Sequence, residues 1–230
     1  MTDIKNLETK EKISFRIGFN YYEVYDKDKD TTYSARISTK TISDFYLNEY
    51  TSLNNELNLL PPLYHPSISE YINFSLNGIK DNYFPTLITE YAQKGPLSKI
   101  IYQNTIKLTP TSELIIIYGV ASGMSYLHSN EVLHCDLKLS NVWLDDRLFP
   151  KITGFDVSEK IESNNKIKTK MIIKGSPAYL APEIYLEKRR NKSSDVYSFS
   201  LFVYELLMKE KPYQEFKDIK EIRDNVTLKN

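Results

Sequence analysis

The sequence predicts an α+β fold in which a small antiparallel β-sheet precedes a mainly helical region. Residues 14–38 alternate apolar and polar side chains in three runs, which is the pattern of half-buried strands. Residues 112–129 repeat apolar side chains at i, i+3 and i+4, which predicts a long helix. Residues 196–207 are apolar on nearly every side and predict a buried helix. Strands followed by helices, rather than alternating with them, are typical of the α+β class.

The N-terminal elements are delimited by turn-forming and helix-breaking residues. A charged turn at residues 26–30 precedes the last strand of the first run. Helical spacing over residues 42–60 ends at two consecutive prolines, because proline cannot continue a helix. Two further strands are expected over residues 67–74 and 84–89.

The C-terminal region begins after a Lys-Gly-Pro sequence at residues 94–96. A short helix is expected over residues 97–102, followed by the long helix at 112–129. Thr111 or Ser112 is suited to cap that long helix, because a hydroxyl oxygen at this place accepts a free backbone N–H.

The bulk composition excludes several classes of protein. The chain has 230 residues, a formal net charge of zero and one cysteine. Without a basic patch, a nucleic-acid partner is not expected. One cysteine excludes an internal disulfide and fits a reducing compartment, so we expect a cytoplasmic protein. Residues 1–16 are too polar for a signal peptide and the apolar stretch 114–127 is too short to cross a bilayer, so no membrane association is expected.

One loop between two apolar runs places an acid, a cation and an amide at fixed offsets: Asp136, Lys138 and Asn141. Such a loop holds Asp136 where its carboxylate accepts a proton from a hydroxyl group. Lys138 would lie near a transferred phosphoryl group, and Asn141 would offer its carbonyl oxygen to a metal ion. The pattern resembles the protein kinase catalytic loop, H-R-D-x-x-x-x-N, with Cys135 in place of the family's arginine.

Three other segments resemble protein kinase motifs and occur in the family's order. Residues 87–92 (LITEYA) resemble the hinge between two lobes, residues 175–183 (GSPAYLAPE) the end of the activation segment, and residues 193–200 (SSDVYSFS) the start of the large C-lobe helix. The resemblance covers about residues 12–226. It is closest to serine/threonine kinases of the tyrosine-kinase-like group.

The resemblance implies a bilobal protein-kinase-like fold. We expect an N-terminal tail at residues 1–11 and a domain at 12–230, with an N-lobe of about 12–92 and a C-lobe of about 93–230. Kinase C-lobes continue for several more helices, so this C-lobe is expected to lack its last helices. One face of the buried helix would then be uncovered, and such an apolar face marks a site for other proteins, a missing segment or an aggregation hazard.

On the substrate side, the resemblance implies Asp136 as the base and Lys138 as the cation that binds phosphate. Ser176 would supply a hydroxyl that braces both. A lysine at 138 together with Gly175 and Ser176 is the pattern of serine/threonine kinases. The alternative is that these side chains only brace the loop.

On the nucleotide side, the resemblance implies an ATP site with altered residues. Arg36 stands where kinases have a lysine, and we pair it with Glu56 rather than Glu49. The alternative is an exposed arginine on a strand. The residues implied to line the ATP site are Gly18, Val24, Ala35, Arg36, Glu56, Thr89, Glu90, Ala92 and Trp143.

Three features weaken the expected ATP and magnesium site. Of the family's glycine-rich lid only Gly18 remains. Gly154 replaces the acid that binds the metal, so Asn141 would be the remaining metal ligand unless the loop slides and brings Asp156 to the ion. Trp143 stands where kinases usually have leucine: it would fill the adenine slot, stack on adenine or turn into the C-lobe core.

The regulatory features are altered as well. Cys135 cannot bind an activation-loop phosphate as an arginine does, and is expected to be an inert buried thiol. Residues 157–174 are polar and predict a mobile loop. Asp195 is expected to hold the backbone of the catalytic loop, to cap its own helix, or both. Glu183 is expected to need a donor other than the family's usual arginine.

These observations leave two main hypotheses. The first is a pseudokinase with lost or very weak use of ATP and magnesium, which acts by binding other proteins. The second is an active serine/threonine kinase that transfers the γ-phosphate of ATP to protein hydroxyls, because Asp136, Lys138, Asn141 and Ser176 are retained. A non-functional fragment is a third reading.

Overall fold

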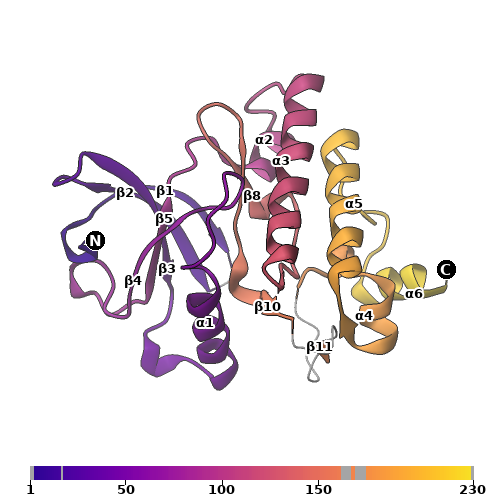
Figure 1. Cartoon of the computed structure of the whole chain (residues 1–230), viewed down its shortest axis with the longest axis horizontal. Coiled ribbons are helices and arrows are strands. Elements are labelled where there is room, and N and C mark those ends of the chain that lie inside the picture. The colour runs from indigo at the N-terminus through magenta and orange to yellow at the C-terminus, as the bar shows by residue number, and fades with distance from the viewer. Residues whose placement is uncertain (1–2, 17, 162–166, 169–174, 229–230) are drawn as a thin grey trace.

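The computed structural model describes residues 3–16, 18–161, 167–168 and 175–228. It has two lobes, an antiparallel sheet with one flanking helix and a mainly helical part (Figure 1). The predicted α+β fold is confirmed. Most of the loop expected to be mobile, residues 162–166 and 169–174, lies outside the described residues.

The N-lobe sheet has five strands in the order β1-β2-β3-β5-β4, and each neighbouring pair is antiparallel. The three expected N-terminal strands are present, and the two later ones are shorter than predicted. The strands are β1 (Glu8–Arg16), β2 (Phe19–Asp26), β3 (Thr31–Ser38), β4 (Tyr71–Ser75) and β5 (Thr86–Glu90).

The N-terminus belongs to the lobe more closely than the expected tail at residues 1–11 allows. Strand β1 already begins at Glu8, and a 3-10 turn, η1 (Ile4–Asn6), precedes it. Ile4 and Leu7 are 3% and 0% exposed, and they pack on the outer face of the sheet. Burial of these two apolar side chains stabilises the contact between the N-terminal segment and the sheet, although most residues of that segment are polar.

Helix α1 (Leu47–Leu59) begins later than predicted, because residues before it form a 3-10 turn, η2 (Ile42–Asp44). The Glu49 carboxylate accepts the backbone N–H of Tyr46 at 2.8 Å and thereby caps the helix. The same carboxylate lies 2.9 Å from the Lys40 ammonium, so Glu49 bonds to groups near the start of the helix. The two prolines end the helix as expected.

In the described part of the C-lobe there are five α-helices: α2 (Leu97–Gln103), α3 (Pro110–Ser129), α4 (Pro182–Glu187), α5 (Lys192–Met208) and α6 (Ile219–Leu228). The cap of α3 is Thr109, and not Thr111 or Ser112 as predicted. Pro110 occupies the first helical position, where its missing N–H has no partner to lose. The Thr109 hydroxyl accepts the Ser112 N–H at 3.1 Å, and the Ser112 hydroxyl accepts the Thr109 N–H at 2.7 Å.

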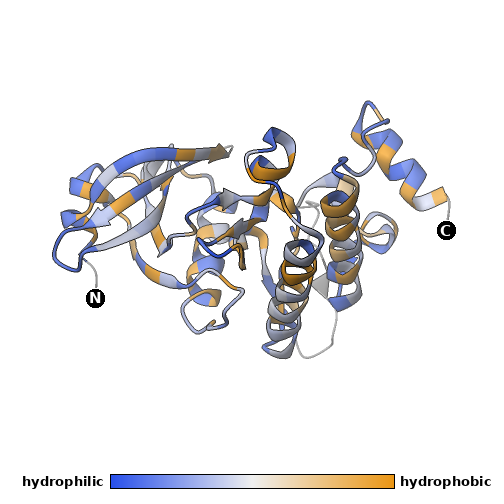
Figure 2. Ribbon diagram, turned by 90° about the horizontal axis from the view of Figure 1, so that it is seen from above, coloured by the Kyte–Doolittle hydropathy of each residue, from blue (hydrophilic) through white to orange (hydrophobic). Residues whose placement is uncertain are grey.

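Helix α5 is buried on one face only, although its sequence is apolar on nearly every side. Phe202 and Leu206 are 0% exposed, whereas Val196 and Met208 are more than half exposed. Figure 2 shows hydrophobic residues along both α3 and α5. One face of α5 is therefore buried and the other is uncovered, as expected from the sequence.

Short strands join the lobes and frame the loops between them. One set is β6 (Gly95–Pro96), β8 (Val142–Leu144) and β9 (Pro150–Ile152). The others are the pairs β7 (Val132–Leu133) with β10 (Glu159–Lys160), and β11 (Ile167–Lys168) with β12 (Arg189–Arg190). Among the described residues, no helix combines the length and hydrophobicity that a bilayer crossing requires.

Candidate active site

The loop between β7 and β8 is held from below by α5. The Asp195 carboxylate accepts the backbone N–H groups of His134 and Cys135, each at 2.9 Å. It also lies 2.9 Å from Nε2 of His128. Cys135 has φ +68°, a left-handed conformation that a non-glycine residue adopts only with such support. Asp195 therefore holds the loop, while Asn191 is the cap of α5.

Asp136 is the centre of a polar network. Its Oδ1 accepts the Ser176 N–H at 2.8 Å, and its Oδ2 lies 2.9 Å from both Asn141 Nδ2 and Lys138 Nζ. Lys138 Nζ also donates to Ser176 Oγ at 2.5 Å. The structure thus brings together all four residues that the resemblance assigned to catalysis. Asp136 is only 1% exposed, so these contacts also brace the loop.

Arg36 and Glu56 form a buried pair deep in the cleft between the lobes. Arg36 Nη1 lies 3.0 Å from Glu56 Oε1, and a second bond joins Nη2 to Oε2. The residues are 7% and 2% exposed, so the alternative of an exposed strand arginine is wrong. Burial alone would lower the pKa of Arg36, but the charges of Glu56, Tyr21 and Asp156 and the bond to Glu56 together outweigh it, and the pKa is raised. The Phe19 ring covers the guanidinium at 4.5 Å.

Two residues implied to line the ATP site face the other way. Val24 and Ala35 are 0% exposed and pack in the outer-face core with Ile88. Because side chains alternate along a strand, Ser34 and Arg36 point into the cleft where Ala35 does not. The assignment of Val24 and Ala35 to the ATP site is therefore wrong.

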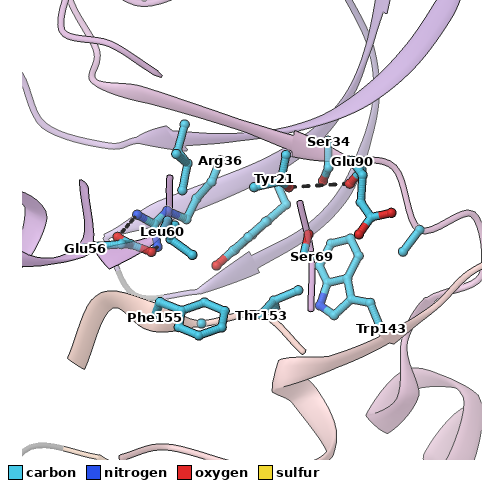
Figure 3. A pocket seen from close by; sticks show the side chains of 14 residues that line it. Tyr21, Ser34, Arg36, Glu56, Leu60, Ser69, Glu90, Trp143, Thr153 and Phe155 are labelled. Carbon is cyan, nitrogen blue, oxygen red and sulfur yellow. Dashed lines mark hydrogen bonds and ion pairs between the residues drawn. The ribbon is translucent and has the colours of Figure 1, made fainter. Parts of the chain in front are cut away.

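The cleft is nearly filled by two aromatic side chains that meet across it. The rings of Tyr21, on β2, and Trp143, on β8, have centroids 5.5 Å apart. Figure 3 shows the Tyr21 ring between Arg36 and Trp143. The cavity left beside them is about 40 Å³, room for roughly three water molecules. Trp143 thus points into the slot, and not into the C-lobe core.

The hinge residues lie where the sequence placed them. Thr89, Glu90 and Ala92 line the small cavity. Glu90 forms an ion pair with Lys151 of β9, whose Nζ lies 2.7 Å from the Glu90 carboxylate. The hydroxyl of Tyr91 donates to Glu23 on β2 at 2.8 Å, and burial together with this bond raises the pKa of Tyr91 to about 12.

Gly154 lies directly against the amide of Asn141. A Cβ atom at position 154 would be 2.7 Å from Asn141 Cγ, and Gly154 has φ +83°, in the left-handed region. The amide Nδ2 donates to the Asp136 backbone oxygen at 2.7 Å and to the Asp136 carboxylate. The amide therefore occupies the space next to residue 154 and faces Asp136.

Asp156 lies beside α1, so the structure does not show the alternative in which the loop slides and Asp156 reaches the ion. The Ser52 hydroxyl donates to its backbone oxygen, and Asp156 lines a second cavity of about 500 Å³ beside α1. Gly18 lines that same cavity and not the slot beneath Tyr21. Among the described residues no three His, Cys, Asp or Glu side chains converge on a metal position. With Gly154 in place of an acid beside Asn141, the residues present do not fit a magnesium ion held as in kinases.

Sequence reasoning missed Tyr21, Ser34 and Ser69 among the lining residues. Tyr21 stands opposite Arg36 in the ladder of β2 and β3, so strand alternation alone places it on the cleft face. Glu183 has the alternative donor that was expected, since Ser194 Oγ donates to it at 2.6 Å. Burial raises the pKa of the Cys135 thiol, as an inert thiol requires.

A bilobal α+β fold with this catalytic loop defines a protein-kinase-like protein. The family model "Protein kinase domain" matches residues 20–229, and the chain belongs to that family. The chain is 29% identical over 182 residues to "Dual specificity protein kinase shkC" of Dictyostelium discoideum, covering 78% of this chain and 35% of that protein. It is 28% identical over 217 residues to "Serine/threonine-protein kinase polo" of Drosophila melanogaster, covering 93% and 36%. The chain thus spans about a third of the length of these two relatives.

Proposed function

We propose that this chain is a pseudokinase domain that acts through protein interactions and has lost, or nearly lost, ATP-dependent phosphoryl transfer. The observation that carries the proposal is the contact between Gly154 and the Asn141 amide. Kinases hold magnesium with an acid at the position of Gly154 and with the asparagine of the catalytic loop. Here the first group is absent, and the asparagine directs its Nδ2 at Asp136, so its carbonyl oxygen is all that remains of the pair for a metal ion.

The small cavity supports the same proposal. Sites for ligands of nucleotide size measure about 300–1,000 Å³. Tyr21 and Trp143 leave about 40 Å³ between the hinge and Arg36. An entering adenine ring would have to displace the Tyr21 ring from Trp143.

The second candidate is an active serine/threonine kinase of the tyrosine-kinase-like group. The retained network of Asp136, Lys138 and Ser176 favours it, as does the buried pair of Arg36 with Glu56. In that case Asp136 accepts the proton of a protein hydroxyl, and Lys138 stabilises charge on the transferred group.

Melting curves with ATP, in the presence and absence of magnesium, separate the two candidates. Ligand binding stabilises the folded state by mass action. The pseudokinase predicts no magnesium-dependent rise in Tm, whereas the active kinase requires one. Radiolabelled phosphate transfer that disappears in Asp136→Asn would overturn the proposal.

We propose the face between α3 and α5 as the surface for a protein partner, in a cytoplasmic setting. A groove of about 410 Å³ lies there, lined by apolar side chains that include Met124, Val196 and Phe199. Exposed apolar patches of this kind commonly mark interaction sites. A Val196→Glu variant that keeps the wild-type Tm is expected to lose a protein that co-purifies with the wild type. Retention of that protein would move the surface elsewhere.

A further inference from the structure

Arg190 has the largest fully buried side chain in the described part of the molecule, with 1% of its surface exposed. It lies on β12, the short strand between α4 and α5. A guanidinium group stays charged in proteins, and burying a charge is unfavourable unless polar groups surround it. A buried arginine outside the cleft therefore requires a structural explanation.

The surroundings of Arg190 belong to the catalytic loop and to the segment that follows it. Burial and the charge of Asp195 raise the pKa of the Cys135 thiol, whereas the charge of Arg190 and a contact between the two side chains lower it, and the charge of Glu159 raises it. Glu159 lies on β10 and stands opposite Leu133 of β7 in the ladder. Two charged side chains from separate segments thus approach one residue of the catalytic loop.

The backbone around Arg190 joins the same segments. Its own strand, β12, pairs with β11, and Ile167 stands opposite Arg190. On the other side, the Ile161 N–H donates to the Glu131 oxygen at 2.7 Å, which extends the pairing of β10 with β7. Strands β10 and β11 both lie in the activation segment, ahead of its end at residues 175–183, and the segment pairs with β7 at one point and with the strand of Arg190 at another.

We propose that Arg190 is a positioning residue that fastens the activation segment to the catalytic loop, and that it supplies from β12 the buried cation for which position 135 offers only a thiol. Because the Arg190 guanidinium and the Glu159 carboxylate both belong to the chain, the attachment of β10 and β11 has its cation and its anion without an added phosphate. The role is independent of phosphoryl transfer, so its test needs no kinase assay and its failure leaves the proposed function untouched.

The test exchanges the cation between the two positions in the full chain. Arg190→Met removes the charge from among polar groups and should lower Tm by about 10 °C. Cys135→Arg alone places a second guanidinium beside the first and should also lower Tm. The double variant Cys135→Arg/Arg190→Met restores one cation and should recover at least half of the loss seen in Arg190→Met. Losses that simply add would overturn the proposal.

Hydrogen exchange reports the attachment itself. In Arg190→Met, amides of residues 159–161 and 189–190 should exchange at least tenfold faster than in the wild type, while those of α3 stay unchanged. In the double variant, their protection should return. Uniform acceleration throughout the C-lobe would indicate lost packing alone and would contradict a positioning role.

Arg189→Met is the matched control, because Arg189 is the neighbour on β12 and its side chain is 41% exposed. Its Tm and exchange rates should equal those of the wild type. Should Arg190→Met fail to fold, the double variant decides: a folded double variant supports the exchange of the cation, and an unfolded one refutes it.

Discussion

The two halves of the interlobe site use their polar residues differently. On the substrate side, Asp136, Lys138 and Ser176 bond to one another with groups that face a common point. On the nucleotide side, Tyr21 and Trp143 pack against each other, and Arg36 is bound to Glu56. One half is a network of polar side chains, and the other is packed around two aromatic rings and a buried ion pair.

Asn141 connects the two halves. Its amide bonds Asp136 on the substrate side and fills the space beside Gly154 on the metal side. A buried polar group needs a partner, and with no metal ligand opposite, the amide finds one in Asp136. Loss of one carboxylate is thus compensated by bonds that keep the other half ordered. The comparison predicts that substitutions on the nucleotide side change the free energy of unfolding more than substitutions elsewhere in the site.

The largest expected effect follows from breaking the buried pair. Glu56→Ala leaves the Arg36 guanidinium buried without its carboxylate and should lower the free energy of unfolding by about 3–5 kcal/mol. Denaturant unfolding without nucleotide measures it. Asn55→Ala, at an exposed neighbour on α1, is the control and should be nearly neutral. An unchanged stability in Glu56→Ala would show that this half is not a structural core.

Removing the contact between Tyr21 and Trp143 tests whether these two rings are what excludes ATP from the cleft. Tyr21→Val/Trp143→Leu should lower stability by about 2–5 kcal/mol, because it removes large buried groups. At an ATP concentration 100 times Kd, it should gain a rise in Tm of about 5–10 °C. The rise should be equal with and without magnesium, since Gly154 remains.

The control for this variant is Tyr22→Val, which changes the neighbouring tyrosine on the outer face of the sheet. It should lose stability without gaining a response to ATP. If the opened variant also ignores ATP, the aromatic pair is not what excludes the nucleotide.

A smaller effect is expected from returning an acid to position 154. Both Gly154→Ala and Gly154→Asp place a Cβ against Asn141 at a left-handed backbone position, and each should cost about 1–3 kcal/mol. Neither should create magnesium-dependent ATP binding while Tyr21 and Trp143 remain. Calorimetric titration of each variant with ATP and magnesium checks that no such binding appears. A binding heat for Gly154→Asp, with Tyr21 and Trp143 still in place, would contradict this expectation.

The smallest effect concerns pH. Burial lowers the pKa of His134, whose Nε2 lies 2.9 Å from the Thr153 backbone oxygen. The unfolded chain therefore binds this proton first, and stability should fall as pH drops below about 6.5, by at most roughly 1.4 kcal/mol per pH unit. Unfolding at pH 7.5 and 5.5, in the wild type and in His134→Asn, measures the difference. An equal slope in both proteins would assign the effect to other groups.

Some features of the site follow from local sequence, as the catalytic loop illustrates. Asp136, Lys138 and Asn141 are separated by fixed offsets within one loop, so their proximity is set by chain connectivity. The hinge residues Thr89 and Glu90 likewise lie on a strand whose pattern is visible in the sequence. Such local relations are readable without coordinates, and so is membership of the protein kinase family.

Val24 and Ala35 show that the sequence alone did not decide which face of the sheet a side chain occupies. Both were assigned to the ATP site from their place in the family's motif, and a shift of one residue along a strand exchanges the core for the cleft. Only the ladder that pairs Tyr22 with Ala35, and Tyr21 with Arg36, decided which side chains enter the slot.

The sequence by itself determined the kinase fold, the grouped substrate-side residues and the missing acid at Gly154, because each depends on residue type and spacing along the chain. The tertiary structure decided the meeting of Tyr21 with Trp143, the closure of Asn141 on Asp136 and the burial of Arg190 beside Cys135. Those contacts join segments that lie far apart along the chain or compete for the same space. Their outcome depends on packing, which no local pattern encodes.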